Sequence, residues 1–247
     1  MKNIHTYRVL ITRELEDGKV LANRLENLGF IPILFPTIKT VPLDFDTKNI
    51  TNYDIFIFGS KKGIKYFFQK ISDRLEKLKD REFIAVGEKT AEKLRDLGFT
   101  NIKIPEVYSS EGVLSLLKND WDYYKNKKIL FPKAKRGIDL LEKTLPNVKP
   151  LYVYETLFNK PENVDGVKSL FENKKIKAVI FTSPSTFLGF KDIFKDEWQN
   201  FLKEVNVISI GKTTGKTLKE QGITDFYIPR KSTVEDILDL IQELFKE

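Results

Sequence analysis

EFIAVGEKTAEKLRDLG (residues 82–98) and NVISIGKTTGKTLKEQG (residues 206–222) follow one pattern over their whole length. Each starts with a short β-branched or aromatic run, turns at a glycine, and continues into an amphipathic stretch that ends at a second glycine. A short apolar run followed by apolar residues at helical spacing predicts a strand and then a helix, and a closing glycine is typical of a helix end. The two segments therefore predict two copies of one strand–loop–helix unit.

A second pair of segments repeats at almost the same distance in the sequence. Residues 55–60 (IFIFGS) match residues 179–183 (VIFTS), so that Ser60 and Ser183 are 123 positions apart, while Gly87 and Gly211 are 124 apart. A chance similarity would not keep one offset across two separate blocks. An internal repeat of this kind indicates that the chain consists of two similar halves.

Runs rich in β-branched and aromatic residues alternate with helical patterns along the 247 residues. We expect strands at residues 8–12, 31–35, 54–58, 82–86, 101–104, 128–131, 150–154, 178–182, 206–210 and 225–228. Helices are expected before Gly29, Gly98 and Gly222, at residues 110–117, and from residue 232 on, where Ser232 and Glu235 fit a capping box. This alternation predicts the α/β class, with parallel sheets covered by helices.

The composition restricts the chemistry and the environment of the protein. The chain has no Cys and a single His, His5, which excludes thiolate catalysis, Cys-based zinc sites and a cluster of His ligands. A Ser-His-Asp triad is not expected either, so acid–base catalysis falls to Asp, Glu, Lys, Tyr or water. No apolar run is long enough to span a membrane, and the N-terminal residues lack the apolar core of a signal peptide. We therefore expect a cytoplasmic protein without a metal.

The formal net charge of +7, from 42 basic and 35 acidic residues, suits an anionic partner. A general lysine bias explains the charge equally well, because the lysines are scattered, and Lys/Glu richness without Cys is also a mild thermophile signature. No basic–aromatic motif predicts nucleic-acid binding. The segment GKTTGKT (residues 211–217) resembles a phosphate-binding Walker A loop, but its first glycine is one position too close. With no G-x-G-x-x-G after a strand either, no nucleotide cofactor is expected.

Taken together, seven short motifs resemble the uroporphyrinogen-III synthase family from Val9 to about Leu240. They are LITR (10–13), FP (35–36), AVGEKTA (85–91), LFPK (130–133) with Arg136, VYET (153–156), FTSPS (181–185) and IGKTT (210–214). Their order, spacing and total length carry the resemblance. The chain departs from the family at Gly59, where a threonine usually precedes the serine.

The resemblance implies two doubly wound, flavodoxin-like parallel-sheet domains joined by a two-strand connector. One domain is then discontinuous, with residues 1–36 and 160–247, and the other consists of residues 43–153. Residues 37–42 and 154–159, which are extended and bounded by prolines, would form the connector.

The resemblance also implies an activity: cyclisation of hydroxymethylbilane to uroporphyrinogen III, with loss of water and inversion of ring D, in a cleft between the domains. It implies no cofactor, a monomer, and transient contact with the preceding, bilane-forming enzyme of tetrapyrrole and heme biosynthesis. Tyr154 is the expected catalytic residue. The expected substrate-binding residues are Thr12, Arg13, Ser60, Gly87, Thr90, Lys133, Arg136, Ser183, Ser185, Gly211, Thr213 and Thr214.

Alternatives remain open for the activity and for individual residues. A two-lobed module could bind a small anion without catalysis, and a two-lobed sugar transferase is a further alternative. The hydroxyls could serve only as helix caps, the basic side chains only as surface charges, and Tyr154 only as a packing residue.

Overall fold

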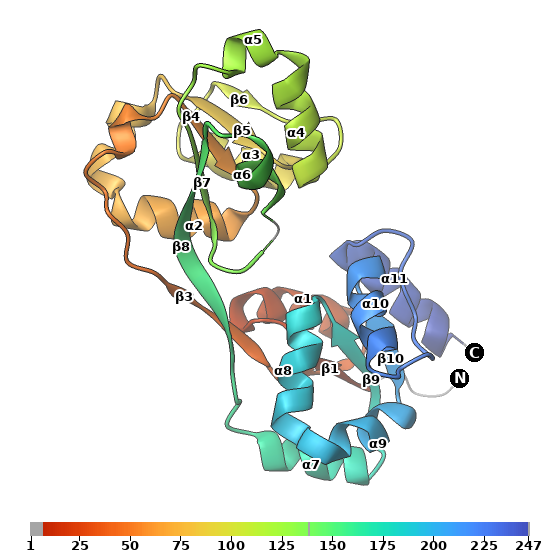
Figure 1. Ribbon diagram of the computed structural model, residues 1–247. Coiled ribbons are helices and arrows are strands. Elements are labelled where there is room, and N and C mark those ends of the chain that lie inside the picture. Colours follow the sequence, from red (N-terminus) through yellow and green to blue (C-terminus); the bar gives the residue numbers. More distant parts are fainter. Residues whose placement is uncertain (1–6, 138, 247) are drawn as a thin grey trace. The chain divides into compact units, whose positions relative to one another are not determined.

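The computed structural model describes residues 7–137 and 139–246, which divide into two compact units (Figure 1). Unit 1 comprises the described residues of Met1–Lys39 and Leu157–Glu247, and unit 2 is Thr40–Thr156. His5, which the sequence places in an N-terminal arm, lies outside the described residues. Each unit contains its own sheet and its own hydrophobic core.

The sheet of unit 1 has four parallel strands in the order β10-β9-β1-β2. Their bounds are β1 Arg8–Ile11, β2 Ile31–Leu34, β9 Ile176–Phe181 and β10 Asn206–Ser209. The strand expected at residues 225–228 is wrong: Tyr227 forms only an isolated parallel bridge with Ile208. The N–H and C=O groups of Tyr227 form hydrogen bonds with the backbone of β10. Pro229, two residues later, has no N–H and cannot extend this pairing.

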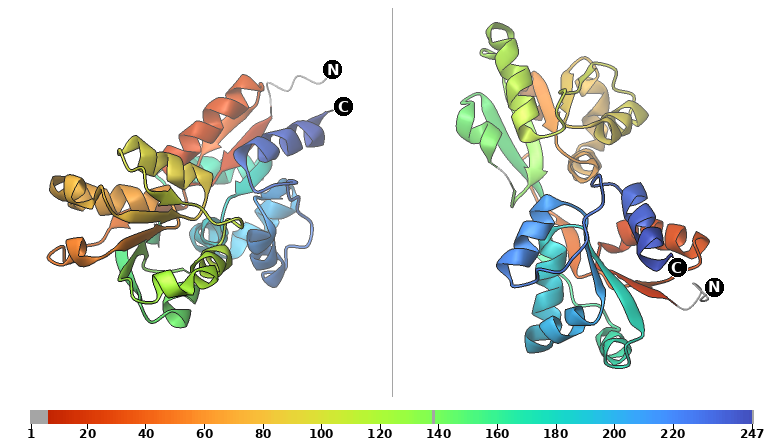
Figure 2. Two further views of the ribbon diagram at one scale, coloured as in Figure 1. Left: turned by 90° about the horizontal axis from the view of Figure 1, so that it is seen from above. Right: turned by 90° about the vertical axis from the view of Figure 1, so that its right-hand side faces the viewer.

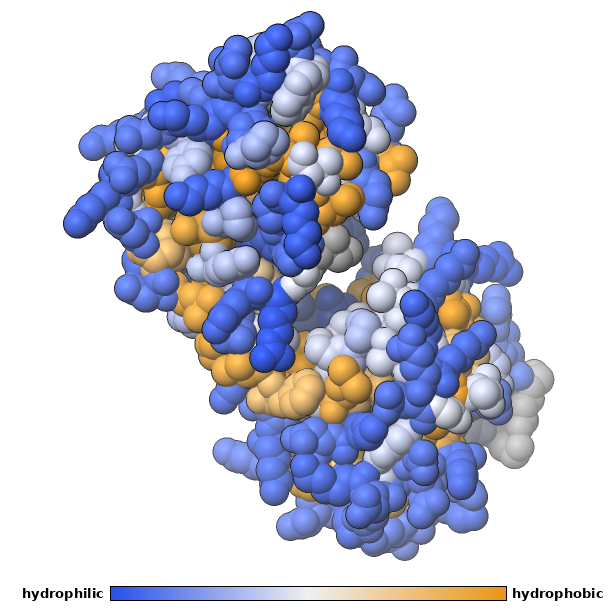
Figure 3. All heavy atoms as spheres, viewed as in Figure 1, coloured by the Kyte–Doolittle hydropathy of each residue, from blue (hydrophilic) through white to orange (hydrophobic). Residues whose placement is uncertain are grey.

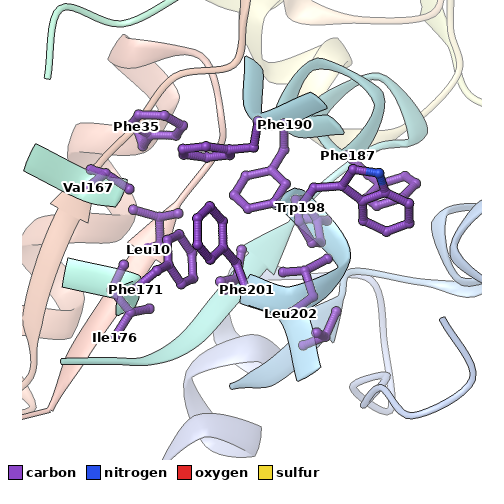
Figure 4. Close-up of a cluster of buried hydrophobic side chains, with 14 of the residues drawn as sticks. Leu10, Phe35, Val167, Phe171, Ile176, Phe187, Phe190, Trp198, Phe201 and Leu202 are labelled. Atoms are coloured by element: carbon purple, nitrogen blue, oxygen red, sulfur yellow. The ribbon is translucent and has the colours of Figure 1, made fainter. Parts of the chain in front are cut away.

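Helices cover both faces of this sheet, because alternate strand residues point to opposite sides. Leu10, Val179 and Phe181 face the cluster of aromatic and aliphatic side chains that Figure 4 shows. The helices on this face are α7 Val164–Glu172, α8 Pro184–Phe194, α9 Trp198–Lys203 and α10 Lys212–Glu220. The opposite face carries α1 Leu15–Asn27 and α11 Val234–Phe245, which lie side by side (Figure 2).

The sheet of unit 2 has the order β3-β8-β7-β4-β5-β6. Its strands are β3 Ile38–Pro42, β4 Ile55–Phe58, β5 Glu82–Ala85, β6 Ile102–Lys103, β7 Ile129–Ala134 and β8 Val148–Phe158. The α-helices are α2 Lys61–Lys70, α3 Glu88–Asp96, α4 Ser110–Asn119, α5 Trp121–Tyr124 and α6 Leu140–Thr144. Within the described residues there are also the 3-10 helices η2 Ile50–Asn52, η3 Ser72–Leu78 and, in unit 1, η4 Lys195–Glu197. β3 and β8 begin in one unit and end in the other.

The two sheets confirm the predicted repeat. The parallel order β8-β7-β4-β5-β6 in unit 2 corresponds to β2-β1-β9-β10 and the bridge at Tyr227 in unit 1. The predicted helix ends are confirmed as well, because Gly29, Gly98 and Gly222 have φ values of 86°, 87° and 86°. A side chain with a Cβ is strained in this left-handed region, which explains the glycine in each copy.

The capping box expected from Ser232 and Glu235 is wrong, because the N-cap lies one residue further along. Thr233 is the N-cap of α11, and its hydroxyl accepts a hydrogen bond from the Asp236 N–H at 3.1 Å. Both residue pairs have the spacing of a capping box, and the backbone geometry decides between them.

Hydrophilic side chains dominate the face of the molecule in Figure 3, and apolar side chains appear there in smaller patches. Within the described residues, no helix combines the length and the apolar character that crossing a bilayer requires.

Candidate functional site

Each sheet has one position at which the strand order reverses. In unit 1 this switch point lies between β1 and β9, since β2 follows on one side and β10 on the other. In unit 2 it lies between β7 and β4. Ligands of open parallel sheets bind beyond the carboxyl ends of the strands at such a point. The loops that follow these four strands, together with those after the adjacent β5 and β10, are therefore the candidate functional loops, and they form one edge in each unit.

The loop after β9 is built around Ser183, the N-cap of α8. Its hydroxyl accepts from the Thr186 N–H at 3.3 Å, the Thr186 hydroxyl accepts from the Ser183 N–H at 3.2 Å, and the Ser183 and Ser185 Oγ atoms are 2.9 Å apart. Ser183 and Ser185 are half-buried. The capping box fixes the loop, while both hydroxyls remain within reach of a ligand.

Gly211 begins α10 as its N-cap at the end of β10. Its carbonyl accepts from the Ser209 hydroxyl at 2.9 Å, and a Cβ at this position would lie 2.4 Å from the Ser232 Oγ. A larger residue here would require the exposed Ser232 side chain to turn away. Of the two threonines that follow, Thr213 is exposed and Thr214 is buried, with 2% of its surface accessible.

The loop after β1 begins with two residues of different character. The Thr12 hydroxyl is fully buried and donates to the Ile180 carbonyl at 2.7 Å, so it links β1 to β9. Arg13 is partly exposed and pairs with Asp17 at 3.5 Å. The structure thus gives Thr12 an internal partner and leaves Arg13 at the edge.

Thr37, which the sequence reasoning missed, organises the same region of unit 1. Its hydroxyl is fully buried and donates to the Thr186 carbonyl at 2.7 Å and to the Thr12 carbonyl at 3.2 Å. A threonine next to a proline in an extended stretch carries no sequence signal for this role.

In unit 2, the structure brings Ser60 and Tyr154 together. The Ser60 Oγ and the Tyr154 Oη are 3.3 Å apart, and either atom can donate. Ser60 is also the N-cap of α2, and it accepts from the Gly63 N–H at 3.1 Å. The preceding Gly59 is exposed, and a Cβ there would come no closer than 3.8 Å to Phe131. This position therefore has room for the threonine side chain that the family usually carries.

Tyr66 is a further member of this cluster that the sequence reasoning missed. Its ring stacks on that of Tyr154, with centroids 5.4 Å apart and an interplanar angle of 28°. In the sequence it appears as one apolar position of an amphipathic helix, which gives no sign of a contact with β8.

Gly87 and Thr90 occupy the loop after β5, at the start of α3. The Gly87 carbonyl accepts the first backbone hydrogen bond of the helix from Thr90 at 2.9 Å, and Thr90 is buried, with 7% of its surface accessible. A Cβ at Gly87 would lie 3.3 Å from the ring of Tyr108. Glu88 puts an acidic residue in the first turn, so this helix terminus is less suited to anions than those of α2, α8 and α10, whose first turns have none.

Two basic residues, Lys133 near the end of β7 and Arg136 in the loop after it, differ in burial. Lys133 is buried, and its Nζ lies 3.0 Å from Asp139 Oδ1 and 2.5 Å from Glu142 Oε1. Burial opposes the charge, but the hydrogen bonds that Lys133 donates to Glu142 and Asp139 outweigh it and raise the pKa of Lys133. Its charge is thus satisfied inside unit 2. Arg136 has a largely exposed side chain and lies 3.9 Å from Glu155.

Within residues 7–137 and 139–246, no group of three or more His, Cys, Asp or Glu side chains is placed to hold a metal ion. The polar groups at the two edges include hydroxyls, backbone N–H groups, arginines and phenols. The N–H groups and arginines match carboxylates, and the hydroxyl oxygens can accept from ring N–H groups.

Comparison with known proteins gives a consistent result. The family model described as uroporphyrinogen-III synthase HemD matches residues 19–239. A putative uroporphyrinogen-III synthase of Methanocaldococcus jannaschii is 30% identical over 96% of this chain and 98% of its own length. A uroporphyrinogen-III synthase of Chlorobaculum parvum is 25% identical over 90% of this chain and 92% of its own.

Among solved structures, the chain is similar to uroporphyrinogen-III synthetase from Helicobacter pylori, with a TM-score of 0.66 and 22% identity. The match spans 96% of this chain and 99% of that one. This likeness supports the fold, and the sequence matches carry the family assignment. The family is one of enzymes of porphyrin biosynthesis. The chain belongs to the uroporphyrinogen-III synthase family.

Proposed function

We propose that this protein cyclises hydroxymethylbilane to uroporphyrinogen III, with loss of water and inversion of ring D. The observation that carries the proposal is the pair of Tyr154 and Ser60 hydroxyls, 3.3 Å apart, beside the switch point of unit 2. This arrangement supplies a proton donor in a chain whose described residues contain neither His nor Cys. A phenol is then the natural acid for a departing hydroxyl.

The substrate's eight carboxylates call for anion-binding groups, and the helix N-termini of α2, α8 and α10 offer them. Each begins with Ser or Gly at the N-cap and has no acidic residue in its first turn, so the N–H groups of that turn suit an anion, although Pro184 removes one of them from α8. Arg13 and Arg136 add charge. We propose that Arg13, Ser60, Arg136, Ser183, Ser185 and Thr213 contact the substrate directly, together with backbone at Gly87 and Gly211.

Thr12, Thr90, Lys133 and Thr214 are buried, and we assign them a supporting part. Thr12 and Lys133 have protein partners that hold the loops after β1 and β7 in place. Thr90 and Thr214 lie in the first turns of α3 and α10. Their contribution to binding is then indirect, through the backbone that they fix.

The mechanism needs little acid strength, because loss of the hydroxyl leaves a cation that the pyrrole ring stabilises. Tyr154 donates a proton to the leaving oxygen, which departs as water. The substituted carbon of ring D then attacks the methylene carbon that the hydroxyl has left, which gives a spiro intermediate. The bond from this ring D carbon to the bridge with ring C breaks and forms again at the free carbon of ring D, which then loses a proton, so the ring is inverted. The protein's main task is to favour this attack over direct closure, and positioning supplies that preference.

Both units have an edge of the same kind, and we propose that one substrate uses both. Residues 37–42 and 154–159 would then act as the connector between domains at residues 1–36 with 160–247 and 43–153. The protein would work as a monomer that receives its substrate from the bilane-forming enzyme.

The decisive experiment supplies freshly made hydroxymethylbilane and separates the porphyrin isomers after oxidation. The proposal expects the inverted isomer in excess over the non-inverted isomer that forms without enzyme. If the purified protein binds the bilane but yields only the non-inverted isomer, it is an anion-binding module and the proposed activity is wrong.

A further inference from the structure

We propose that Tyr66 is a positioning residue that holds the phenol of Tyr154 in its working orientation, an inference that rests on the proposed function. Tyr66 lies on α2 and Tyr154 on β8, and both belong to unit 2. Their ring centroids are 5.4 Å apart at an interplanar angle of 28°. A contact of this kind restricts the Tyr154 ring from one side.

The far end of Tyr66 is anchored to β3. Its Oη lies 2.8 Å from the Thr40 Oγ1, and it donates to the Thr40 carbonyl at 3.3 Å. The helix that carries Tyr66 is itself fixed, because the neighbouring Phe67 and Phe68 are buried in the core of unit 2. Tyr66 is therefore held at two points, at its backbone by the packing of α2 and at its hydroxyl by Thr40.

The Tyr154 hydroxyl has the Ser60 hydroxyl as its hydrogen-bond partner. The Gly63 N–H donates to the Ser60 Oγ at 3.1 Å, so the Ser60 hydroxyl hydrogen is free to point at the Tyr154 Oη, 3.3 Å away. If Ser60 donates in this pair, the proton of Tyr154 is left for another acceptor. Ser60 then orients the proton, and Tyr66 orients the ring that carries it.

This arrangement explains why α2 contributes two polar side chains to one phenol. The helix begins at the switch point with Ser60 and places Tyr66 against β8 further along.

The test compares Tyr66→Leu, which removes the stack, with Tyr66→Phe, which keeps it. We expect Tyr66→Leu to lower kcat about tenfold while KM stays within about twofold, because a misplaced catalytic group slows the chemical step more than binding. Tyr66→Phe should retain most of kcat. The matched control is Tyr53→Leu, because Tyr53 also packs against this core but makes its ring contact with Phe56. This control should leave kcat unchanged.

Both substitutions are repeated in a Tyr154→Phe background. If Tyr66 acts through the Tyr154 hydroxyl, Tyr66→Leu causes no further loss once that hydroxyl is gone. An equal loss in both backgrounds, or an unchanged kcat for Tyr66→Leu, overturns the proposal. So does full turnover by Tyr154→Phe alone.

A readout without turnover separates this inference from the proposed function. In protein labelled with ring-¹³C tyrosine, the Tyr154 signal is identified by its loss in Tyr154→Phe. It should move in Tyr66→Leu and stay in Tyr66→Phe. If the wild-type protein forms no inverted isomer, the proposed activity fails, and this spectrum still decides the positioning: an unmoved Tyr154 signal contradicts it.

Discussion

Ser60 and Ser183 occupy the same place in the two units: each is the N-cap of the helix that follows the strand at a switch point. The Ser60 hydroxyl accepts from the Gly63 N–H at 3.1 Å, and the Ser183 hydroxyl accepts from the Thr186 N–H at 3.3 Å. The repeat in the sequence thus corresponds to a repeat of one local geometry. Only Ser60 has a tyrosine as its further partner.

Replacement of either cap by alanine should destabilise only the unit that contains it. Ser60→Ala and Ser183→Ala should each lower the free energy of unfolding by about 1 kcal/mol, because one N–H of the first turn loses its partner. The two tryptophans report the units separately, since Trp121 lies in unit 2 and Trp198 in unit 1. Urea unfolding of single-tryptophan variants measures each effect.

Ser110→Ala is the matched control for these variants, because Ser110 follows the N-cap Ser109 and the cap hydrogen bond belongs to Ser109. Its effect should be close to zero. Equal losses for both tryptophan signals in one cap variant would show that the units do not unfold independently.

Tyr154→Phe should lower kcat by about a hundredfold, within the usual range for loss of a general acid, with little change in KM. The phenyl ring keeps the stack on Tyr66, so the fold should be retained. Steady-state kinetics with isomer analysis measures the effect. Tyr152→Phe, two residues earlier on β8 and exposed, is the control that should behave like the wild type. Equal kinetics for the two variants would rule out the role of Tyr154.

Lys133 offers a test of internal pairing against substrate binding. Lys133→Met should cost about 3 kcal/mol of unfolding free energy, because it leaves the nearly buried carboxylate of Glu142 without its partner. The double variant Lys133→Met/Glu142→Leu should recover most of this loss. Lys143→Ala should have almost no effect, since the exposed Lys143 pairs with Asp139 at 3.6 Å near the surface. If the double variant is as stable as the wild type yet has a raised KM, Lys133 also binds substrate.

The same cluster predicts how the stability of unit 2 depends on pH. The hydrogen bond from Lys133 lowers the pKa of Asp139 from its ordinary value of 3.8. The Asp139 carboxylate therefore stabilises unit 2 above pH 3.8, and this stabilisation is lost as the pH falls through the lowered, folded-state pKa. The pKa of Lys133 is raised from 10.5, so its contribution is present below that value and is lost as the pH rises beyond it. Urea unfolding followed by Trp121 should show both losses. Lys133→Met should abolish the alkaline loss and reduce the acidic one, because Lys133 is the main cause of the Asp139 shift.

Gly189→Ala should destabilise unit 1 by about 2 kcal/mol, because the added Cβ would lie 2.4 Å from the Thr37 carbonyl oxygen. That carbonyl also accepts from the Asn159 N–H at 2.9 Å, so it cannot move freely. Gly166→Ala in α7 is the matched control, since no atom lies within 4 Å of the new Cβ, and it should stabilise the unit by about 0.5 kcal/mol. Urea unfolding followed by Trp198 distinguishes the two, and a neutral Gly189→Ala would show that α8 shifts at little cost.

The elements that the sequence predicts well are those with a local cause. Four strands are short, apolar and bounded by turn residues, and they are the ones followed by Ser60, Gly87, Ser183 and Gly211. In addition, glycines with positive φ end three helices. Residues 225–228 look the same in the sequence but form only one bridge, because a strand needs a partner edge and free N–H groups along its length.

The sequence by itself determined the fold class, the repeat and the loops that carry the candidate site, because each depends on local periodicity and on residue types with restricted backbone geometry. Tertiary structure alone decided which of these side chains are available. It buried Thr12 against Ile180, paired Lys133 with Asp139 and Glu142, and placed Tyr66 and Ser60 against Tyr154. These contacts join residues far apart in the chain, and their partners follow from the order and register of the strands, which no single segment contains.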